Sequence, residues 1–396
     1  MPEAVVAILR RLEEAGHETW CVGGAIRDGL LGSPGSDVDL ATAATPDVVR
    51  RLFPRTIPVG IEHGTVGVLD DDGVLHEVTT FRQDVRTDGR RAEVVFGVTL
   101  ADDLARRDFT INAIAYHPLR EEWADPFRGR EDLARGVVRA VGDAAQRFRE
   151  DRLRILRALR FAARFEFAIE PATWTAVVDQ GRDTGHLSAE RVRDEWWKGV
   201  ATTQDLGVLA RLWDASGVAA TWLPLEPGSA AAEAAMLSSL TSRRDPVLAL
   251  AAWRGPVEAH LKRLRCSGAE IARGRAIDRA VSRPLDASPA KVRQWLSAVG
   301  DAADDLMALA AWRGTIADGW PDVVAGVRSR GEATTRAQLA VTGDDLVRAG
   351  IVAPGPALGR LLERLLGDVL EQPELNDYDT LMRRAAALAP DDTTHA

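Results

Sequence analysis

The sequence predicts an α+β fold, in which a mixed α/β domain over residues 1–141 is followed by helices up to residue 388. Short apolar runs typical of strands lie between helical segments up to about Val141. From Asp143 onward these strand patterns nearly vanish, and Ala, Leu and Arg dominate, interrupted by Gly and Pro. At 396 residues the chain is also too long for one ordinary core, which predicts two or more domains.

The first domain is expected to alternate helices and strands. Periodicity and turn residues predict helices over residues 4–15, 25–31 and 46–53, and strands over 20–22, 37–41, 56–59, 64–69 and 74–81. The Asp-Asp-Asp-Gly segment at 70–73 provides the turn between the last two strands. Residues 83–93 are polar and rich in Arg and Asp, so we expect a mobile loop there.

The second half is expected to be helical throughout. Residues 142–200 contain three expected helices, at 147–164, 171–180 and 188–200, and residues 201–388 form a further helical region. Residues 248–255 recur almost unchanged at 307–314, which indicates either an internal repeat or two helices of similar composition. Residues 389–396 are expected to be frayed.

Composition restricts the possible classes of protein. The net charge of −9 argues against a generally basic nucleic-acid binder, although local arginine clusters leave room for a binding patch. No run approaches the roughly 20 apolar residues of a membrane span, and the first residues lack the basic start of a signal peptide. With only Cys21 and Cys266 there is no disulfide framework, so a cytoplasmic setting is expected.

The first chemical motif combines a Gly-Gly turn with an Asp-x-Asp pair. Gly23 and Gly24 open a short helix, where backbone N–H groups can bind phosphate. Asp37 and Asp39 alternate on a strand and therefore share a face, and two such carboxylates suit Mg²⁺. Taken alone, the pair could equally be a capped turn. Together the two halves predict nucleotidyl transfer.

Three later segments show a family resemblance. They are residues 77–82 (EVTTFR), 106–115 (RRDFTINAIA) and 150–161 (EDRLRILRALRF). With the first motif, and in the same order, they resemble the class II tRNA nucleotidyltransferase and bacterial poly(A) polymerase family over roughly residues 18–200. The resemblance implies a polymerase-beta-like nucleotidyltransferase head, a neck with base recognition at 142–200, and a helical body and tail.

The resemblance implies a two-metal reaction. Asp37 and Asp39 would be catalytic and hold two Mg²⁺ ions while the 3′-hydroxyl of tRNA attacks the α-phosphate of CTP or ATP and pyrophosphate leaves. Glu77 lies at the position of a third carboxylate ligand, although a surface glutamate would look the same. Gly23, Gly24 and Arg27 would bind the triphosphate.

Two further groups of residues would bind the nucleoside. Arg107, Asp108 and Asn112 match a ribose-binding motif, although an ordinary start of a surface helix would fit too. Asp151, Arg154 and Arg157 share one face of the expected helix at 147–164. The resemblance implies that Asp151 and Arg154 replace a nucleic-acid template. A carboxylate can accept from the amino group of C or A, and a guanidinium can donate to the neighbouring ring nitrogen. G and U present a carbonyl and an N–H at these positions, so they are rejected.

Short motifs indicate which enzymes of the family the chain resembles most. Residues 60–66 (GIEHGTV) resemble CCA-adding enzymes, and the Gly-Arg-Arg-Phe-Arg run of poly(A) polymerases does not occur. The family resemblance assigns the switch from C to A to the 83–93 loop, in which Ala92 replaces the usual proline. Enzymes that add only CC, only A or a poly(A) tail, and an inactive RNA-binding descendant, remain alternatives. No His precedes an Asp, so no phosphohydrolase domain of the His-Asp type is expected.

The helical tail is expected to bind the acceptor arm and 3′ end of tRNA through shape and phosphate contacts. The candidate RNA-binding residues are Lys262, Arg263, Arg265, Arg273 and Arg275. Glu190, Arg191 and Glu195 match a family motif that braces the head against the neck.

Overall fold

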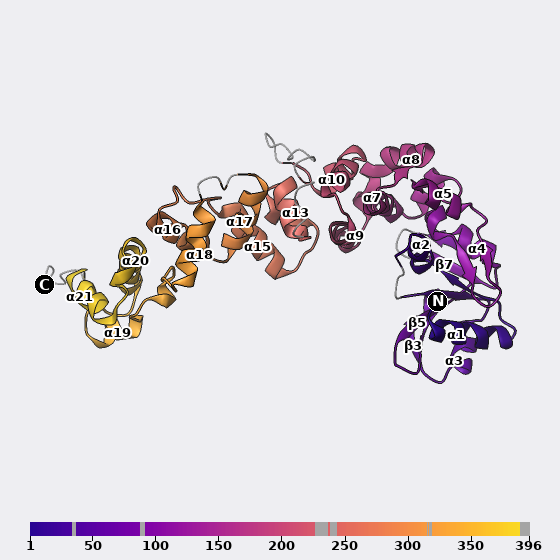
Figure 1. The fold of residues 1–396 in the computed structure, drawn as a ribbon, viewed down its shortest axis with the longest axis horizontal. Coiled ribbons are helices and arrows are strands. Elements are labelled where there is room, and N and C mark those ends of the chain that lie inside the picture. The colour runs from indigo at the N-terminus through magenta and orange to yellow at the C-terminus, as the bar shows by residue number, and fades with distance from the viewer. Residues whose placement is uncertain are drawn as a thin grey trace. The chain divides into compact units, whose positions relative to one another are not determined.

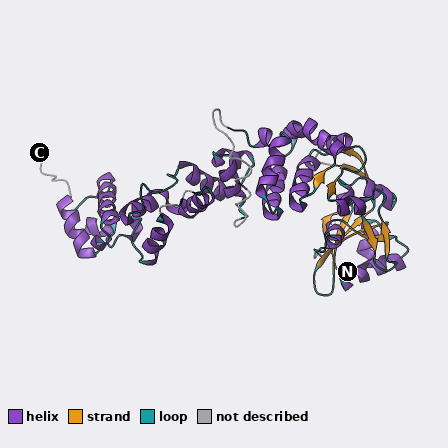
Figure 2. Cartoon of the chain, turned by 45° about the horizontal axis from the view of Figure 1, so that its top comes forward, coloured by secondary structure: helices purple, strands orange, loops and turns teal. Residues whose placement is uncertain are grey.

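The computed structural model describes residues 1–33, 37–87, 92–225, 237, 244–314, 316 and 319–388. The chain forms two compact units, one of residues 1–246 with 263–265 and the other of residues 247–262 with 266–396 (Figure 1). Among the described residues, strands occur only in the first unit (Figure 2). The expected head and neck thus share one unit, which extends to residue 246 rather than to residue 200. The frayed end expected at 389–396 lies outside the described residues.

A seven-stranded mixed sheet forms the centre of the head. Its strands, in spatial order, are β3 (Thr56–Gly60), β4 (Thr65–Leu69), β5 (Leu75–Thr80), β2 (Asp39–Thr42), β1 (Thr19–Val22), β8 (Ala115–His117) and β9 (Glu122–Ala124). Among the described strands of this sheet, only β2 and β5 pair in parallel. Residues in register on parallel strands point to the same face, so Leu40 of β2 and Val78 of β5 share one side of the sheet.

Helices cover the sheet and then form the neck. In the first unit they are α1 (Glu3–Glu14), α2 (Gly24–Leu30), α3 (Pro46–Leu52), α4 (Leu100–Ala105), α5 (Gly129–Arg135), α6 (Ala144–Glu150), α7 (Leu153–Phe165), α8 (Pro171–Gly181), α9 (Ala189–Thr202), α10 (Leu206–Ala215) and α11 (Val218–Trp222). The expected positions of α1, α2, α3, α8 and α9 are confirmed to within a few residues.

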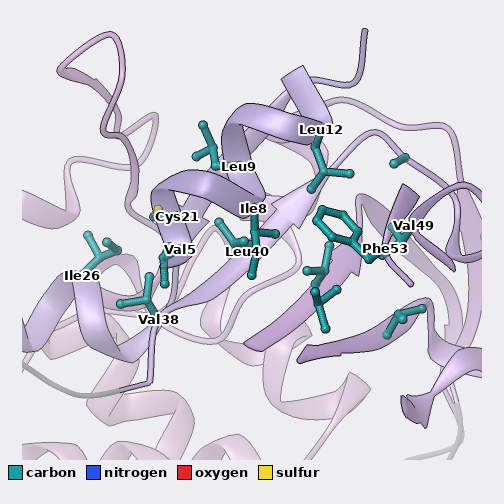
Figure 3. Packing of buried hydrophobic residues seen from close by; sticks show 14 of the residues in the cluster. Val5, Ile8, Leu9, Leu12, Cys21, Ile26, Val38, Leu40, Val49 and Phe53 are labelled. Carbon is teal, nitrogen blue, oxygen red and sulfur yellow. The ribbon is translucent and has the colours of Figure 1, made fainter. Parts of the chain in front are cut away.

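One hydrophobic core lies between α1, α3 and the sheet. Apolar residues of α1 recur three and four positions apart, which places Val5, Leu9 and Leu12 on one fully buried face. Figure 3 shows this face packed against Leu40 of β2 and Phe53 at the end of α3. This packing fixes β2, and therefore fixes Asp39 at its first residue.

The segment at 83–93 differs from the sequence expectation. Strands β6 (Arg82–Thr87) and β7 (Ala92–Phe96) pair as an antiparallel hairpin, so a loop was the wrong assignment for these residues. The backbone alternation of a two-stranded ribbon tolerates polar side chains on both faces, which is why periodicity did not reveal the strands. Residues 88–91 lie outside the described residues.

The neck also departs from expectation, because the helix expected at 147–164 is two helices. Helix α6 ends at Glu150, and Asp151 takes an extended conformation with φ −147° and ψ 105°. Its Oδ1 accepts the backbone N–H of Leu153 at 3.0 Å, which satisfies a free donor at the start of α7. The expectation that Asp151 shares a helical face with Arg154 and Arg157 is therefore wrong, although both arginines lie in α7 at the expected spacing. The short strand β10 (Val137–Val138) pairs in parallel with β11 (Ala168–Ile169), and β11 lies beyond the expected strand region.

Gly129, at the start of α5, packs tightly against Thr110 and provides a stability test. A Cβ on Gly129 would overlap the carbonyl oxygen of Thr110 and lie 2.8 Å from Cγ1 of Ile114. We expect Gly129→Ala to lower Tm by several degrees through overpacking. Gly29→Ala is the control, because nothing lies within 4 Å of that Cβ and alanine favours the helix. Equal Tm values in thermal unfolding of the two variants would contradict the expectation.

The second unit is helical. Its described helices are α13 (Pro246–Trp253), α14 (Val257–Arg263), α15 (Gly268–Arg279), α16 (Pro289–Val299), α17 (Ala303–Trp312), α18 (Trp320–Ser329), α19 (Gly343–Arg348), α20 (Pro356–Glu371) and α21 (Tyr378–Leu388). The two copies of the repeated segment lie at the ends of α13 and α17. Helix α13 ends at the buried Trp253, and α17 ends at the half-buried Trp312. Buried Arg293 of α16 donates to the carbonyl oxygens of Leu370 and Glu371 at the end of α20. Among the described residues, no helix is long and apolar enough to cross a membrane.

Candidate active site

A cavity of about 600 Å³ lies within the first unit, between the head and the neck. Nine Arg or Lys residues and three Asp residues occur among the described residues that line it. The lining residues are Gly23, Gly24, Arg27, Asp39, Arg106, Arg107, Asp108, Asn112, Asp151, Leu153, Arg154, Arg157, Arg160, Phe161, Arg164, Arg191 and Lys198. All nine residues expected from the sequence to bind nucleotide are among them. This excess of positive charge suits a polyanionic ligand.

The glycine turn and the second aspartate of the first motif meet at one corner of this cavity. Gly23 has φ 85°, which favours glycine, and it precedes the first turn of α2. A Cβ on Gly23 would lie 2.9 Å from Oδ2 of Asp39 and 3.9 Å from Nη1 of Arg107. The missing side chain therefore allows the turn, the carboxylate and the guanidinium to approach one another.

Asp39 carries an unfavourable charge in the protein alone. Burial, followed by the nearby Glu77 carboxylate, raises its pKa to about 6, although Arg107 opposes the shift. Asp37 adds a smaller repulsion and is exposed just before β2. The described His, Cys, Asp and Glu residues form no group of three or more that could hold a metal ion. The Glu77 carboxylate thus repels that of Asp39 electrostatically, but the two do not form a three-carboxylate site with Asp37.

The residues expected to bind the triphosphate and ribose form one buried hydrogen-bonded chain. Arg27, whose guanidinium lies over the rings of Phe161 and Phe165, donates to Oδ1 of Asn112 at 2.5 Å. Asn112 donates to Asp108 at 2.9 Å, and Arg157 donates to the other oxygen of that carboxylate at 2.7 Å. Burial raises the pKa of Asp108, but Arg157 and the hydrogen bonds have the larger, opposite effect, so the pKa lies below its usual value.

The two residues expected to choose the base have protein partners. Arg191 of α9 donates to Oδ2 of Asp151 at 2.8 Å. Arg154 donates to the backbone oxygen of Arg106 at 2.9 Å and to Glu150 at 3.3 Å. A carboxylate has about four acceptor positions and a guanidinium five donors. Both side chains line the cavity and retain the capacity to bind a further group.

Helices α7 and α9 also provide wall residues that were not predicted from the sequence. Arg160, Phe161 and Arg164 lie three, four and seven residues after Arg157, which places them on the same helical face. That spacing was the signal by which they could have been found. Arg160 pairs with the buried Glu195 at 2.6 Å, and Arg164 pairs with Asp28 at 2.9 Å. The second contact links α7 to α2.

The five candidate RNA-binding cations all make contacts within the protein. Lys262 and Arg275 both pair with Glu258, and Arg273 forms a two-pronged pair with Asp305. Arg263 donates to the carbonyl of Thr221 at 3.0 Å, and Arg265 pairs with Glu190 at 3.0 Å. The structure therefore does not gather them into one group of unneutralised charges. A phosphate would have to share or displace these partners.

Comparison with known proteins identifies relatives of the chain in both sequence and structure. Residues 19–139 match the model of the poly A polymerase head domain. The chain is 36% identical to a CCA-adding enzyme of Limosilactobacillus fermentum over 96% of each chain, and 36% identical to one of Leuconostoc mesenteroides over 96% of this chain and 94% of the relative. It also resembles the crystal structure of the Bacillus stearothermophilus CCA-adding enzyme in complex with CTP, with a TM-score of 0.79 and 31% identity over 98% of this chain and 99% of the other.

Proposed function

The chain belongs to the family of CCA-adding enzymes, and on that premise we propose that it adds CCA to the 3′ end of tRNA from CTP and ATP. The observation that carries this function is the single cavity that Asp39, the Gly23 turn and the pair Asp151 and Arg154 share. The 3′-hydroxyl of the RNA attacks the α-phosphate, the bond to the β-phosphate breaks, and pyrophosphate leaves.

We propose Mg²⁺ as the metal, because the donor set fits it. Asp37 and Asp39 offer hard carboxylate oxygens, and Mg²⁺ binds proteins through one or two carboxylates together with substrate phosphates. Burial and then Glu77 raise the pKa of Asp39 in spite of Arg107, so a bound cation would favour its ionised form. When bound, two Mg²⁺ ions would stabilise the charge that develops on the attacking and leaving oxygens. Glu77 would strengthen the negative field that attracts them.

Base selection is assigned to the two side chains at the junction of α6 and α7. Asp151 accepts from the amino group of C or A, and Arg154 donates to the adjacent ring nitrogen. The corresponding edges of G and U present a carbonyl and an N–H. The carboxylate would then face an acceptor and the guanidinium a donor, so neither hydrogen bond could form. Because Arg191 and the carbonyl of Arg106 hold these side chains, the pair keeps its geometry between additions.

The other lining residues position the nucleotide. Arg27 and Gly24 face the triphosphate, and Asp108 accepts from the ribose 2′-hydroxyl while Arg157 and Asn112 hold it. We propose that the helical region at 201–388 binds the tRNA acceptor arm. Lys262, Arg263, Arg265, Arg273 and Arg275 remain its candidate phosphate contacts, and a cytoplasmic location remains a prediction.

The function is tested with purified protein, Mg²⁺ and tRNA transcripts that lack CCA, CA or only the final A. We expect CMP to be added to the first two and AMP to the third, with negligible GMP or UMP. Addition that stops after CC, that starts only after CC, or that continues as a poly(A) tail would identify one of the related activities instead. A protein that binds these transcripts but adds no nucleotide would be an inactive descendant.

A further inference from the structure

A buried carboxylate lies behind the wall of the cavity. Asp103, in helix α4, is 0% exposed and does not itself line the cavity. Its Oδ1 accepts from Nε and Nη2 of Arg106, at 3.0 and 2.8 Å. Its Oδ2 accepts from Nη2 of Arg107 at 3.2 Å. A single carboxylate thus binds two neighbouring guanidinium groups.

Both guanidinium groups belong to the nucleotide site. Arg106 and Arg107 line the cavity, and Nη1 of Arg107 lies near the Gly23 turn beside Asp39. Arg107 also donates to the carbonyl of Asn112 at 3.4 Å. Arg107 therefore lies where the phosphates of a nucleotide would lie if the Gly23 turn and Asp39 receive them, and Arg106 lines the same cavity.

Holding two guanidinium groups around one buried carboxylate is energetically unfavourable in two respects. Two adjacent guanidinium groups repel each other, and a carboxylate removed from water loses its hydration. Burial raises the pKa of Asp103, but Arg106 and Arg107 lower it by more, so the group is ionised in the protein. The carboxylate therefore neutralises part of the repulsion and fixes the orientation of both side chains. Long, flexible arginine side chains bind a ligand better when they are held beforehand.

We propose that Asp103 is a positioning residue that holds Arg106 and Arg107 against the triphosphate of the incoming nucleotide. This inference rests on the proposed function of the same cavity. It concerns the phosphates, which CTP and ATP share, so it predicts equal effects on both nucleotides. Base choice belongs to Asp151 and Arg154 and should not change.

The positioning role and the charge of Asp103 alone predict opposite effects on nucleotide binding, so a substitution at Asp103 distinguishes them. Asp103→Asn removes one negative charge behind the site, and without repositioning it would strengthen the binding of a polyanion. If Asp103 positions the arginines, the same variant should raise KM for CTP and for ATP by roughly 10- to 100-fold. We expect a smaller change in kcat. Asp103→Glu keeps the charge and should recover part of the loss.

A neighbouring residue provides a matched control. Asp102 lies in the same helix, is half-buried, and caps the helix together with Thr99. Asp102→Asn should lower Tm, since it weakens the cap of α4, and should leave both KM values unchanged. Arg106→Ala removes one of the held side chains without altering the buried carboxylate. Its effect on KM and that of Asp103→Asn should be less than additive in the double variant.

The experiment combines steady-state addition of CMP and AMP with calorimetric binding of tripolyphosphate in Mg²⁺ buffer. Weaker tripolyphosphate binding by Asp103→Asn, with partial recovery in Asp103→Glu, supports the proposal. Unchanged or tighter binding overturns it, as does a lower Tm with KM unchanged. If the wild-type protein adds no nucleotide, the proposed function fails, but the tripolyphosphate measurement still decides whether Asp103 orients an anion site.

Discussion

Asp39→Asn is expected to lower the rate of CMP and AMP addition by at least about 1000-fold, because it removes a carboxylate ligand at the reacting centre. The side chain lies 2.9 Å from the position of a Gly23 Cβ, so the variant changes charge and ligand chemistry without changing volume at this tight corner. Single-turnover addition to tRNA that lacks CCA measures the effect. Addition at more than a tenth of the wild-type rate contradicts the assignment.

The same substitution is expected to stabilise the metal-free protein. The carboxyl pKa is raised from 3.8 to about 6, so the folded state binds this proton more tightly than the unfolded chain does. The free energy of unfolding therefore falls as pH rises from about 4 to about 6, since the unfolded state loses the proton first. Asp39→Asn avoids this loss. We expect its Tm in EDTA to exceed that of the wild type above pH 6 and to match it near pH 4.

Asp37→Asn provides the control for this pair of effects. Asp37 is exposed, and its contribution to the shift at Asp39 is the smallest of the four causes. Its substitution should reduce activity without a comparable gain in Tm. Mg²⁺ should raise the Tm of the wild type and should raise that of Asp39→Asn less. A lower Tm for Asp39→Asn in EDTA at pH 7 would contradict the electrostatic explanation.

The fold class and most elements of the head could be predicted because each depends on local periodicity. The apolar face of α1, the apolar run of β4 and the alternating residues of β5 carry their own signal. The nine expected nucleotide-binding residues were found through motifs that the family shares, and all nine line one cavity. Membership of the family is confirmed by relatives that match over nearly the whole chain.

Features that depend on contacts between distant residues could not be predicted in this way. The break between α6 and α7 occurs where Asp151 binds the N–H of Leu153, a choice that helical spacing alone does not reveal. The partner of Asp151 is Arg191, 40 residues later in the chain. Likewise the expected tail cations all have partners within the protein. Lys262 pairs with Glu258 inside one helix, but the pair of Arg273 with Asp305 joins residues that only the fold brings together.

Asp151→Ala is expected to have the second largest effect, on the choice of base. Removing the carboxylate leaves the amino group of C or A without its acceptor, so kcat/KM for CTP and ATP should fall by roughly 100-fold. UTP and GTP lose a repulsive contact at the same time. The ratio of correct to incorrect addition should therefore fall further than the rate does. Competition between all four nucleotides on tRNA that lacks CCA measures this ratio.

Asp151→Asn separates base recognition from the structural role of this residue. The amide keeps an oxygen that can accept the N–H of Leu153, so the start of α7 should stay capped and Tm should change little. Its NH₂ group can instead donate to the carbonyl of U or G. We expect UMP addition to increase relative to that in Asp151→Ala, even though Arg154 still disfavours U. Base choice unchanged in both variants, at full rate, would mean that no protein template operates through Asp151.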